Sequence, residues 1–287
     1  MSIPLSVCIL ACDEEQELER CIRAVQWADE VVVLVDAKSR DGSEATARRM
    51  ASRVECRAYS GDIDQKRYCT TLAKNDWVLI VDPDEVVSDR LAKSIRERLS
   101  SEMTSNQAQG RDRVVAFQVN RLTYHLGRWI RHGDYYPDWK LRLFRKSCAH
   151  WTGRDPHGRV EVDGACRQIE GELFHYSYRD LADQVSRIQF FSDQAAQSLV
   201  RDGQRFRIRD LILRPFARFL RGYLLRSGFK DGLPGFMIAV ASAFYVFLKY
   251  AKQWEGQREK LRKLQSAGRA EDSKSLPKPS RDEGPRD

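Results

Sequence analysis

Five apolar residues lead directly into an acidic turn in the stretch Trp77-Val78-Leu79-Ile80-Val81-Asp82-Pro83-Asp84-Glu85. An apolar run this short, bounded by turn residues, is typical of a strand buried on both faces of a sheet. Two similar runs precede it, Leu5 to Ala11 and Val31 to Asp36, and each is followed by a segment with helical spacing. Repeated strand and helix units of this length predict a parallel sheet, so we expect residues 1–100 to form a doubly wound α/β domain.

The same reading predicts the remaining elements of residues 1–178. Within the first half we expect a strand near Val54 to Ala58 and helices over Gln65 to Ala73 and Asp89 to Leu99. A polar surface loop is expected over Ser100 to Arg113, followed by strands over Val114 to Val119, Leu141 to Phe144 and Gly158 to Val162. We interpret residues 101–178 as the acceptor-facing half of the same domain.

The chain after residue 178 has a different character. Helical spacing runs from Asp180 to Val200 and again from Leu211 to Leu225, where Ile212 and Phe216 share one face opposite several arginines. Residues 201–232 hold nine Lys or Arg against three Asp or Glu. A basic amphipathic helix of this kind favours contact with an anionic membrane surface, and the alternative is a helix packed on the domain with a solvated arginine face. We therefore predict a helical, membrane-associating region over residues 179–255.

The apolar run Phe236 to Leu248 has thirteen residues, fewer than the roughly 20 that span a bilayer, so we expect a core or interfacial helix. Residues 256–287 are charged and expected to be disordered.

Composition excludes several classes of protein. With 42% hydrophobic residues among 287, the chain can bury a substantial core, which excludes wholesale disorder. The net charge of +8 is concentrated late in the chain, which argues against a nucleic-acid partner. Seven cysteines form no C-x-x-C pair, and the N-terminus lacks the features of a signal peptide, so we expect a cytoplasmic protein.

The acidic turn is the first candidate for chemistry. Asp82 and Asp84 follow a strand end, where ligands of open α/β sheets bind, and two adjacent carboxylates suit a hard divalent ion such as Mg²⁺ or Mn²⁺. The alternative is that these acids cap the next helix. Asp36 ends a second strand beside a Ser/Gly turn and adds a carboxylate to the same pocket. No G-x-G-x-x-G follows the first strand and no P-loop motif occurs, which weakens the dinucleotide-oxidoreductase and P-loop readings.

These residues resemble a family 2 glycosyltransferase of the GT-A fold, that is, a Rossmann-like nucleotide-diphospho-sugar transferase domain, here followed by C-terminal amphipathic helices. The resemblance is carried by Ser6 to Ala11, Asp13-Glu14-Glu15, Ala28-Asp29-Glu30, Val35-Asp36, Ser39, Asp41-Gly42, Gln65-Lys66 and Asp76 to Glu85. Later motifs are similar to those of the lipopolysaccharide-core glucosyltransferase subgroup: Leu126-Gly127-Arg128-Trp129-Ile130, Tyr136-Pro137-Asp138, Leu141-Arg142-Leu143-Phe144, His175-Tyr176-Ser177-Tyr178 and Ser242 to Tyr250.

The resemblance implies a role for each donor-side residue. Asp36 would contact the nucleotide base, Lys66 the diphosphate, Asp82 the ribose or the metal, and Asp84 would be the principal metal ligand. Asp13, which stands where relatives usually have Asn, belongs to the same nucleotide-sugar site. A divalent ion and a lysine would neutralise a departing diphosphate without proton transfer.

On the acceptor side, this sequence lacks one residue that the subgroup usually has. An inverting transfer needs a general base, and the subgroup's usual His-Glu is here His157-Gly158, so the expected glutamate is missing. Asp138, Asp155 and Glu161 are the candidates, and Asp138 is favoured because it lies in an aromatic loop.

For the acceptor itself we expect contacts from Trp129, Tyr136, Arg142 and His157, with core packing as the alternative for the aromatic side chains. The resulting expectation is an inverting, metal-dependent hexosyltransferase that uses a nucleotide sugar and a lipopolysaccharide-core or other lipid-linked acceptor at the inner face of the cell membrane. The alternatives are a catalytically impaired nucleotide-sugar-binding protein and a sugar nucleotidyltransferase.

Overall fold

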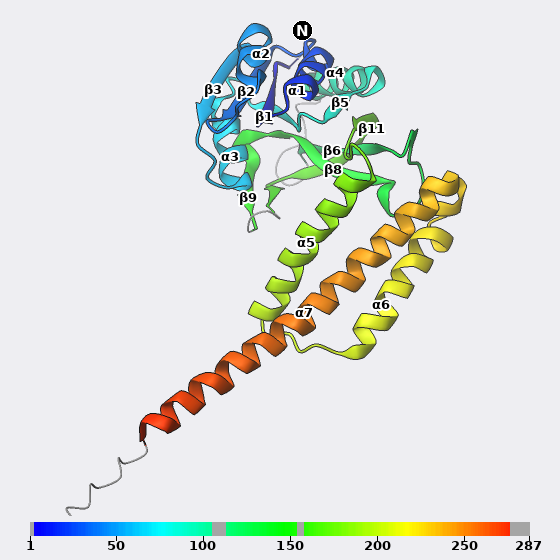
Figure 1. Ribbon diagram of the computed structural model, residues 1–287. Helices are drawn as coiled ribbons and strands as arrows, with labels where there is room; N and C mark the ends of the chain where they lie inside the picture. Colours follow the sequence, from blue (N-terminus) through cyan, green and yellow to red (C-terminus); the bar gives the residue numbers. More distant parts are fainter. Residues whose placement is uncertain (1–2, 105–112, 154–157, 276–287) are drawn as a thin grey trace, which may run out of the picture.

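The computed structural model describes residues 3–104, 113–153 and 158–275. A sheet flanked by helices forms one end of the molecule, and three long helices extend from it (Figure 1). The predicted α/β class is confirmed, and the helices follow the sheet in the chain, as the sequence indicates.

The first half of the sheet is parallel. Its strands lie in the order β3-β2-β1-β4, and the connecting helices run between successive strands. The strands are β1 (Leu5–Ala11), β2 (Glu30–Asp36), β3 (Arg53–Arg57) and β4 (Trp77–Val81), and the helices are α1 (Glu15–Val25), α2 (Ser43–Met50) and α3 (Asp62–Leu72). Since parallel strands end at a common edge, the acids after β2 and β4 meet there.

The second half makes the sheet mixed. Beyond β4 the order continues β8-β6-β11-β5, with β8 antiparallel to β4 and to β6. The elements are β5 (Glu85–Val87), α4 (Asp89–Thr104), β6 (Val114–His125), β7 (Arg128–Trp129), β8 (Asp138–Arg145) and β11 (Ala165–His175), while β9 (Ala149–Thr152) and β10 (Arg159–Val162) form a separate ribbon. Strands β5 and β11 were not expected, and α4 occupies the start of the predicted loop, whose residues 105–112 lie outside the described ranges.

The core lies on both faces of the sheet. On one face, Leu18 and Ile22 of α1 and Leu91 and Ile95 of α4 are fully buried against the strands. On the other face, buried residues of α3 pack against Phe144 of β8. Apolar burial of this extent is the main favourable contribution to folding, and it fixes the strand ends that carry the polar residues.

Three helices form the C-terminal part. They are α5 (Leu181–Arg201), α6 (Ile208–Leu220) and α7 (Gly232–Ser275), with a π-helical turn over Arg221–Leu225 and a 3-10 turn over Gly228–Asp231 between the last two. Helix α7 packs against both others and runs beyond them at its far end (Figure 1).

Two expectations about these helices need correction. The apolar run 236–248 belongs to a longer helical segment, Gly228–Lys260, in which an 18-residue window has a mean hydropathy of 1.6. By length and composition this helix could cross a membrane, so the thirteen-residue length of the run does not exclude a span. The charged segment from residue 256, expected to be disordered, continues as helix to Ser275 because it is rich in strong helix formers. Residues 276–287 lie outside the described ranges.

The apolar side chains of α6 and of the turn after it have two different environments. Ile212 and Phe216 are about 60% exposed, at 61% and 62%, whereas Phe219 and Tyr223 pack their rings against Phe236 of α7. The apolar residues of α6 are therefore divided between an internal contact and the molecular surface.

Candidate active site

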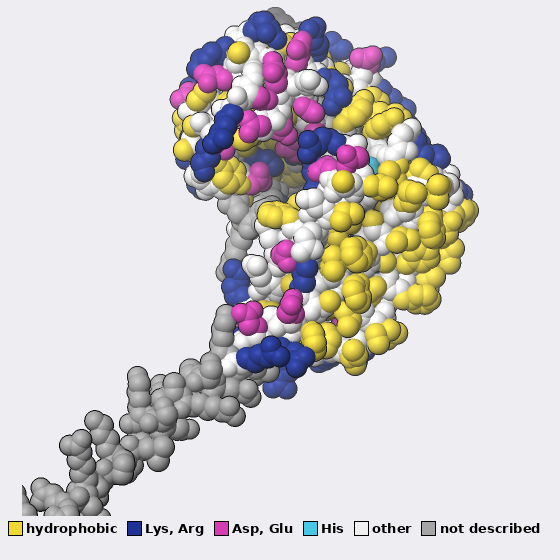
Figure 2. Space-filling model, viewed as in Figure 1, with side chains coloured by type: hydrophobic (Ala, Val, Ile, Leu, Met, Phe, Trp, Pro, Cys, Tyr) yellow, Lys and Arg dark blue, Asp and Glu magenta, His cyan; other side chains and the backbone are white. Residues whose placement is uncertain are grey.

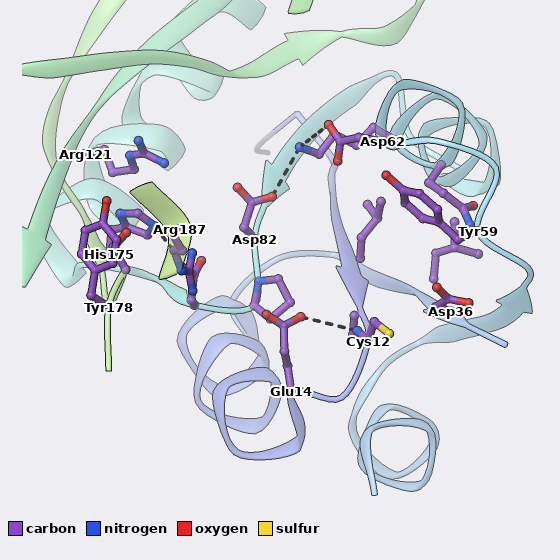
Figure 3. Close-up of a pocket in the computed structure, with 18 of the residues that line it drawn as sticks. Cys12, Glu14, Asp36, Tyr59, Asp62, Asp82, Arg121, His175, Tyr178 and Arg187 are labelled. Carbon is purple, nitrogen blue, oxygen red and sulfur yellow. Dashed lines mark hydrogen bonds and ion pairs between the residues drawn. The ribbon is translucent and has the colours of Figure 1, made fainter. Parts of the chain in front are cut away.

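A cavity of about 590 Å³ opens at the carboxyl ends of the parallel strands. This volume is in the range of about 300–1,000 Å³ that small-molecule sites usually have. Figure 3 shows Asp36 and Tyr59 on one side of it, with Arg121, His175 and Tyr178 on the opposite side. The cavity thus joins residues of the first strands to residues that follow β11.

The Asp36 end of the cavity is built by the turns after β1 and β2. Leu10, Cys12, Leu34 and Tyr59 line it, so it combines apolar side chains with one carboxylate. Asp36 Oδ1 accepts a hydrogen bond of 2.9 Å from the backbone N of Lys38, which fixes the carboxylate at the turn.

Asp82 is held by cations on two sides. Arg142 Nη2 lies 2.5 Å from Asp82 Oδ2 and 2.7 Å from Glu85 Oε1, and Lys66 Nζ lies 3.6 Å from Asp82 Oδ1. Although burial opposes ionisation, the charges of Arg142 and Lys66 hold the pKa of Asp82 well below its usual range. Asp82 and Lys66 both line the cavity, whereas Arg142 lies behind the carboxylates and does not, so it is not at an acceptor surface.

Asp84 has a different environment. Its Oδ2 lies 3.2 Å from His175 Nε2, and no Lys or Arg of the described residues forms an ion pair with it. The described residues also contain no group of three His, Cys, Asp or Glu side chains arranged as a complete metal site. Mg²⁺ is commonly bound by one or two carboxylates together with substrate phosphates and water, so Asp84 at the cavity wall fits such an incomplete ligand set.

Glu14 is a cavity residue that the sequence analysis named without a role. It precedes α1, and its Oε2 accepts a hydrogen bond of 3.4 Å from the backbone N of Cys12. Burial raises the pKa of Glu14 to about 7, the hydrogen bond from Cys12 opposes this, and the negative charge of Asp84 adds to it. A cation bound near Asp84 would therefore also favour ionised Glu14.

The cavity wall opposite Asp36 was missed by sequence reasoning. It is lined by Arg121 of β6, by Ser177 and Tyr178 after β11, and by Arg187 and Phe191 of α5. The signal for Ser177 and Tyr178 was present in the motif His175-Tyr176-Ser177-Tyr178, but nothing in the sequence indicated that α5 reaches the strand ends.

Besides Arg142 and Asp138, three expected site residues, Asp13, Trp129 and Tyr136, lie outside the cavity lining. Asp13 connects two loops, since its Oδ1 accepts a hydrogen bond of 2.6 Å from the backbone N of Arg40. The Trp129 ring packs among aromatic side chains, with its centroid 4.7 Å from that of Phe174, as the core-packing alternative foresaw. Tyr136 lines a separate cavity of about 280 Å³.

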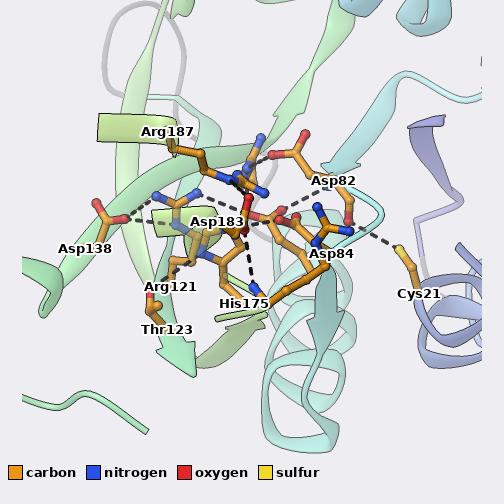
Figure 4. Close-up of polar contacts among 12 residues, drawn as sticks. Cys21, Asp82, Asp84, Arg121, Thr123, Asp138, His175, Asp183 and Arg187 are labelled. Atoms are coloured by element: carbon orange, nitrogen blue, oxygen red, sulfur yellow. Dashed lines mark hydrogen bonds and ion pairs between the residues drawn. The ribbon is translucent and has the colours of Figure 1, made fainter. Parts of the chain in front are cut away.

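The candidates for the general base are only partly described. Asp138 lies beside the site and pairs with Arg121 Nη2 at 2.8 Å and Lys140 Nζ at 3.0 Å, as Figure 4 shows for Arg121. Burial would raise the pKa of Asp138, but the charges of Arg121 and Lys140 lower it, so its carboxylate is ionised at neutral pH. Asp155 and His157 lie outside the described residues.

Gly158 adjoins α3 closely. A Cβ atom added there would come within 2.1 Å of Ile63 Cγ1, so a glutamate at this position would require Ile63 to move. Glycine at position 158 is therefore compatible with this close approach to Ile63, whereas the glutamate expected from the resemblance is not.

Comparisons with known proteins agree with this geometry. The chain is 28% identical over 257 residues to an uncharacterized glycosyltransferase of Rickettsia typhi, covering 86% of each chain. It is also 28% identical over 267 residues to the lipopolysaccharide core biosynthesis glycosyltransferase LpsC of Rhizobium meliloti, covering 91% of this chain and 95% of the relative.

Similarity to solved structures is more distant. A mycobacterial protein shares 16% identity and a TM-score of 0.42, covering 62% of this chain and 69% of that one. The sequence model of glycosyl transferase family 2 matches residues 6–168. With this match over more than half its length, the chain belongs to glycosyltransferase family 2 and is a glycosyltransferase of the GT-A fold.

Proposed function

We propose that this enzyme is an inverting, metal-dependent glycosyltransferase that moves a hexose from a nucleotide sugar to a lipopolysaccharide-core or other lipid-linked glycan. The observation that carries the donor half of the proposal is the meeting of Asp36, Lys66, Asp82 and Asp84 around one cavity. Similarity to LpsC, a lipopolysaccharide core biosynthesis glycosyltransferase, supports the acceptor class.

In this proposal each donor group meets a matching part of the cavity. Asp36 accepts a hydrogen bond from the base, whose faces contact Leu34 and Tyr59, and Lys66 approaches the diphosphate. Binding the nucleotide at several points fixes the anomeric carbon in front of the acceptor hydroxyl, which lowers the entropic part of the barrier.

Asp84 would hold Mg²⁺ or Mn²⁺, which when bound supplies positive charge to the departing diphosphate. Asp82, whose charge is already paired with Arg142 and Lys66, would lie near the ribose. The lack of a Lys or Arg partner for Asp84 among the described residues supports this choice, because a carboxylate already paired with an arginine attracts a metal less strongly. His175, 3.2 Å from Asp84, orients that carboxylate.

The proton of the acceptor hydroxyl would pass to Asp138 or Asp155. Asp138 is ionised, as a base must be, and its partner Arg121 lines the cavity. Replacing each residue with Asn separately would distinguish them: the base variant should lose transfer to acceptor while it still binds the nucleotide sugar.

The C-terminal helices would hold the enzyme on the inner face of the cell membrane. Ile208, Ile212 and Phe216 of α6 and Leu233 and Phe236 of α7 are exposed by 42–64%. Figure 2 shows hydrophobic side chains gathered over these helices. Arg221, Arg226 and Lys230 lie exposed nearby, and cations beside an apolar face are attracted to anionic lipid.

A nucleotide-release assay tests the donor half. Wild-type enzyme should release nucleotide from one member of a panel of UDP-, GDP- and dTDP-sugars only with Mg²⁺ or Mn²⁺, and Asp84→Ala should reduce the rate about 100-fold or more. Asp89→Ala, which removes an exposed acid at the start of α4, is the matched control and should stay within about twofold. Turnover that is unchanged by a chelator would contradict the metal assignment, and no release from any donor would favour the impaired alternative.

A further inference from the structure

A second cavity, of about 250 Å³, lies between the sheet part and the C-terminal helices. It is lined by residues of α5, α6 and α7 together with Tyr135 and Tyr178. The cavity of about 590 Å³ described above, in which we propose that the donor binds, is called the donor cavity below. Tyr178, Arg187 and Phe191 line both cavities, so the two cavities adjoin along one wall. A group bound in the second cavity would therefore lie next to the reacting end of a bound donor.

Two guanidinium groups reach this cavity from different helices. Arg187 Nε lies 3.3 Å from Asp183 Oδ1, and Arg218 Nε lies 3.0 Å from Asp134 Oδ2. The Arg187 and Arg218 side chains nevertheless remain 45% and 37% exposed. Each guanidinium group therefore keeps a surface that a carboxylate or phosphate can reach.

The surrounding side chains suit a sugar. Tyr135, Tyr178 and Tyr245 bring phenol groups to the lining, and Ile188 and Phe191 add apolar surface. Burial raises the pKa of Tyr135 well above its usual value, and the neighbouring Tyr178 adds to this, so Tyr135 remains a hydrogen-bond donor. Aromatic faces with hydroxyl groups can contact both the C–H surface and the hydroxyls of a sugar ring.

Arg142, which the sequence suggested for the acceptor, and Arg128 of the neighbouring motif both have partners inside the protein. Arg142 is paired with Asp82 and Glu85 inside the protein, and Arg128 Nη1 donates a hydrogen bond of 3.0 Å to the backbone O of Asp231. Within the described residues, Arg187 and Arg218 are the arginines that line the second cavity.

We propose that the cavity between α5, α6 and α7 is the acceptor subsite, and that Arg187 and Arg218 bind a phosphate or carboxylate group on the acceptor sugar. This inference rests on the proposed function. The cavity is smaller than the usual range of about 300–1,000 Å³, so it suits one sugar unit with its charged substituent. It also adjoins the helices with the exposed apolar face, where a lipid-linked sugar would arrive (Figure 2).

Calorimetric titration with glucose 6-phosphate, glucose and UDP tests this subsite. Wild-type enzyme with UDP and Mn²⁺ should bind glucose 6-phosphate more tightly than glucose, and Arg218→Gln should weaken sugar phosphate binding about tenfold or more. Arg218 is chosen because Arg187 also borders the donor cavity. Arg209→Gln, on an exposed position of the same helix, is the matched control and should bind like wild type.

A second variant tests the subsite independently, in case Arg218→Gln does not fold. Ala241→Phe should fill the cavity from α7 without altering either arginine, so it should abolish sugar phosphate binding and leave UDP binding unchanged. If wild type binds UDP but not glucose 6-phosphate, or if both variants bind it normally, the subsite is overturned and the donor proposal stands. If none of UDP, GDP and dTDP binds, the proposed function itself fails.

Phosphatidylglycerol vesicles separate the two sources of the anionic group. For an acceptor subsite, Arg218→Gln should lose the sugar phosphate and retain wild-type vesicle binding. If the variant instead loses vesicle binding and wild type ignores the sugar phosphate, the cavity receives a lipid headgroup and the acceptor assignment is wrong.

Discussion

At the scale of single residues, the carboxylates of the acidic turn differ in their cationic partners. Asp82 and Glu85 share Arg142, whereas Asp84 faces only the imidazole of His175 among the described ionic partners. The sequence predicted the carboxylates at the strand end, because they adjoin an unmistakable apolar run. It did not predict their partners, since Arg142 lies 60 residues from Asp82 in the chain and only the pairing of β4 with β8 brings them together.

Removing Arg142 should destabilise the protein strongly. Arg142→Met would leave Asp82 and the fully buried Glu85 without their main cation, and breaking a buried pair in this way costs about 3–5 kcal/mol. Arg90→Met, which breaks an exposed pair with Glu170, should have a much smaller effect, because solvent screens such a pair. Urea denaturation followed by circular dichroism measures both, and equal losses would contradict the structural role of Arg142.

Glu14 should make stability depend on pH. Its pKa is about 7 in the folded protein against 4.5 in the unfolded chain, so the folded state keeps a proton that the unfolded chain has lost. The free energy of unfolding should therefore fall as pH rises from about 4.5 to about 7, by at most about 2 kcal/mol for this partly exposed group.

Denaturation in metal-free buffer at several pH values measures this effect. Glu14→Gln should flatten the decline, whereas Glu44→Gln, at an exposed i,i+4 pair on α2, should leave it in place. An unaltered pH profile in Glu14→Gln would show that the carboxyl group titrates normally.

At the scale of elements, the strands with continuous apolar runs were predictable, whereas the polar strand β11 was not. β1, β2 and β4 have almost only apolar residues and are buried along their length. β11 carries the sequence ACRQIEGELFH and pairs with β6 through register shifts, so neither its composition nor a regular alternation identified it. Its position follows from its neighbours, which one sequence does not reveal.

The junction between β7 and the 3-10 turn before α7 depends on one buried acid. Asp231 is 1% exposed and accepts hydrogen bonds from the backbone N of Arg131 at 3.1 Å and of His132 at 2.8 Å. Asp231→Ala would leave these donors unsatisfied and should lower the free energy of unfolding by about 2–4 kcal/mol.

The control for this junction is Asp193→Ala, which removes a half-exposed pair with Lys252 between α5 and α7. It should cost less than about 1 kcal/mol. Equal losses in the two variants, measured by thermal unfolding, would mean that Asp231 is an ordinary surface acid.

At the scale of the whole molecule, the exposed apolar face predicts how the enzyme meets lipid. Phe216→Glu would place a charge on this face, so it should reduce the flotation of the protein with anionic liposomes several-fold. Tyr59→Glu, a similarly exposed aromatic position that lines the cavity of the sheet part, should float like wild type because Tyr59 belongs to neither α6 nor α7. Flotation that is indifferent to Phe216→Glu and to lipid charge would contradict membrane contact through α6.

The position of α5 determines where this enzyme could be joined to part of another transferase. Residues 6–168 match the family, but Arg187 and Phe191, which border both cavities, come later in the chain. A chimera that grafts residues 1–178 onto the helices of another transferase would exchange one wall of both cavities while keeping the acids that we propose as catalytic. The selectivity for the acceptor should then depend on which enzyme supplies α5. A segment that is exchanged between two such enzymes should therefore include α5 and should not end at β11.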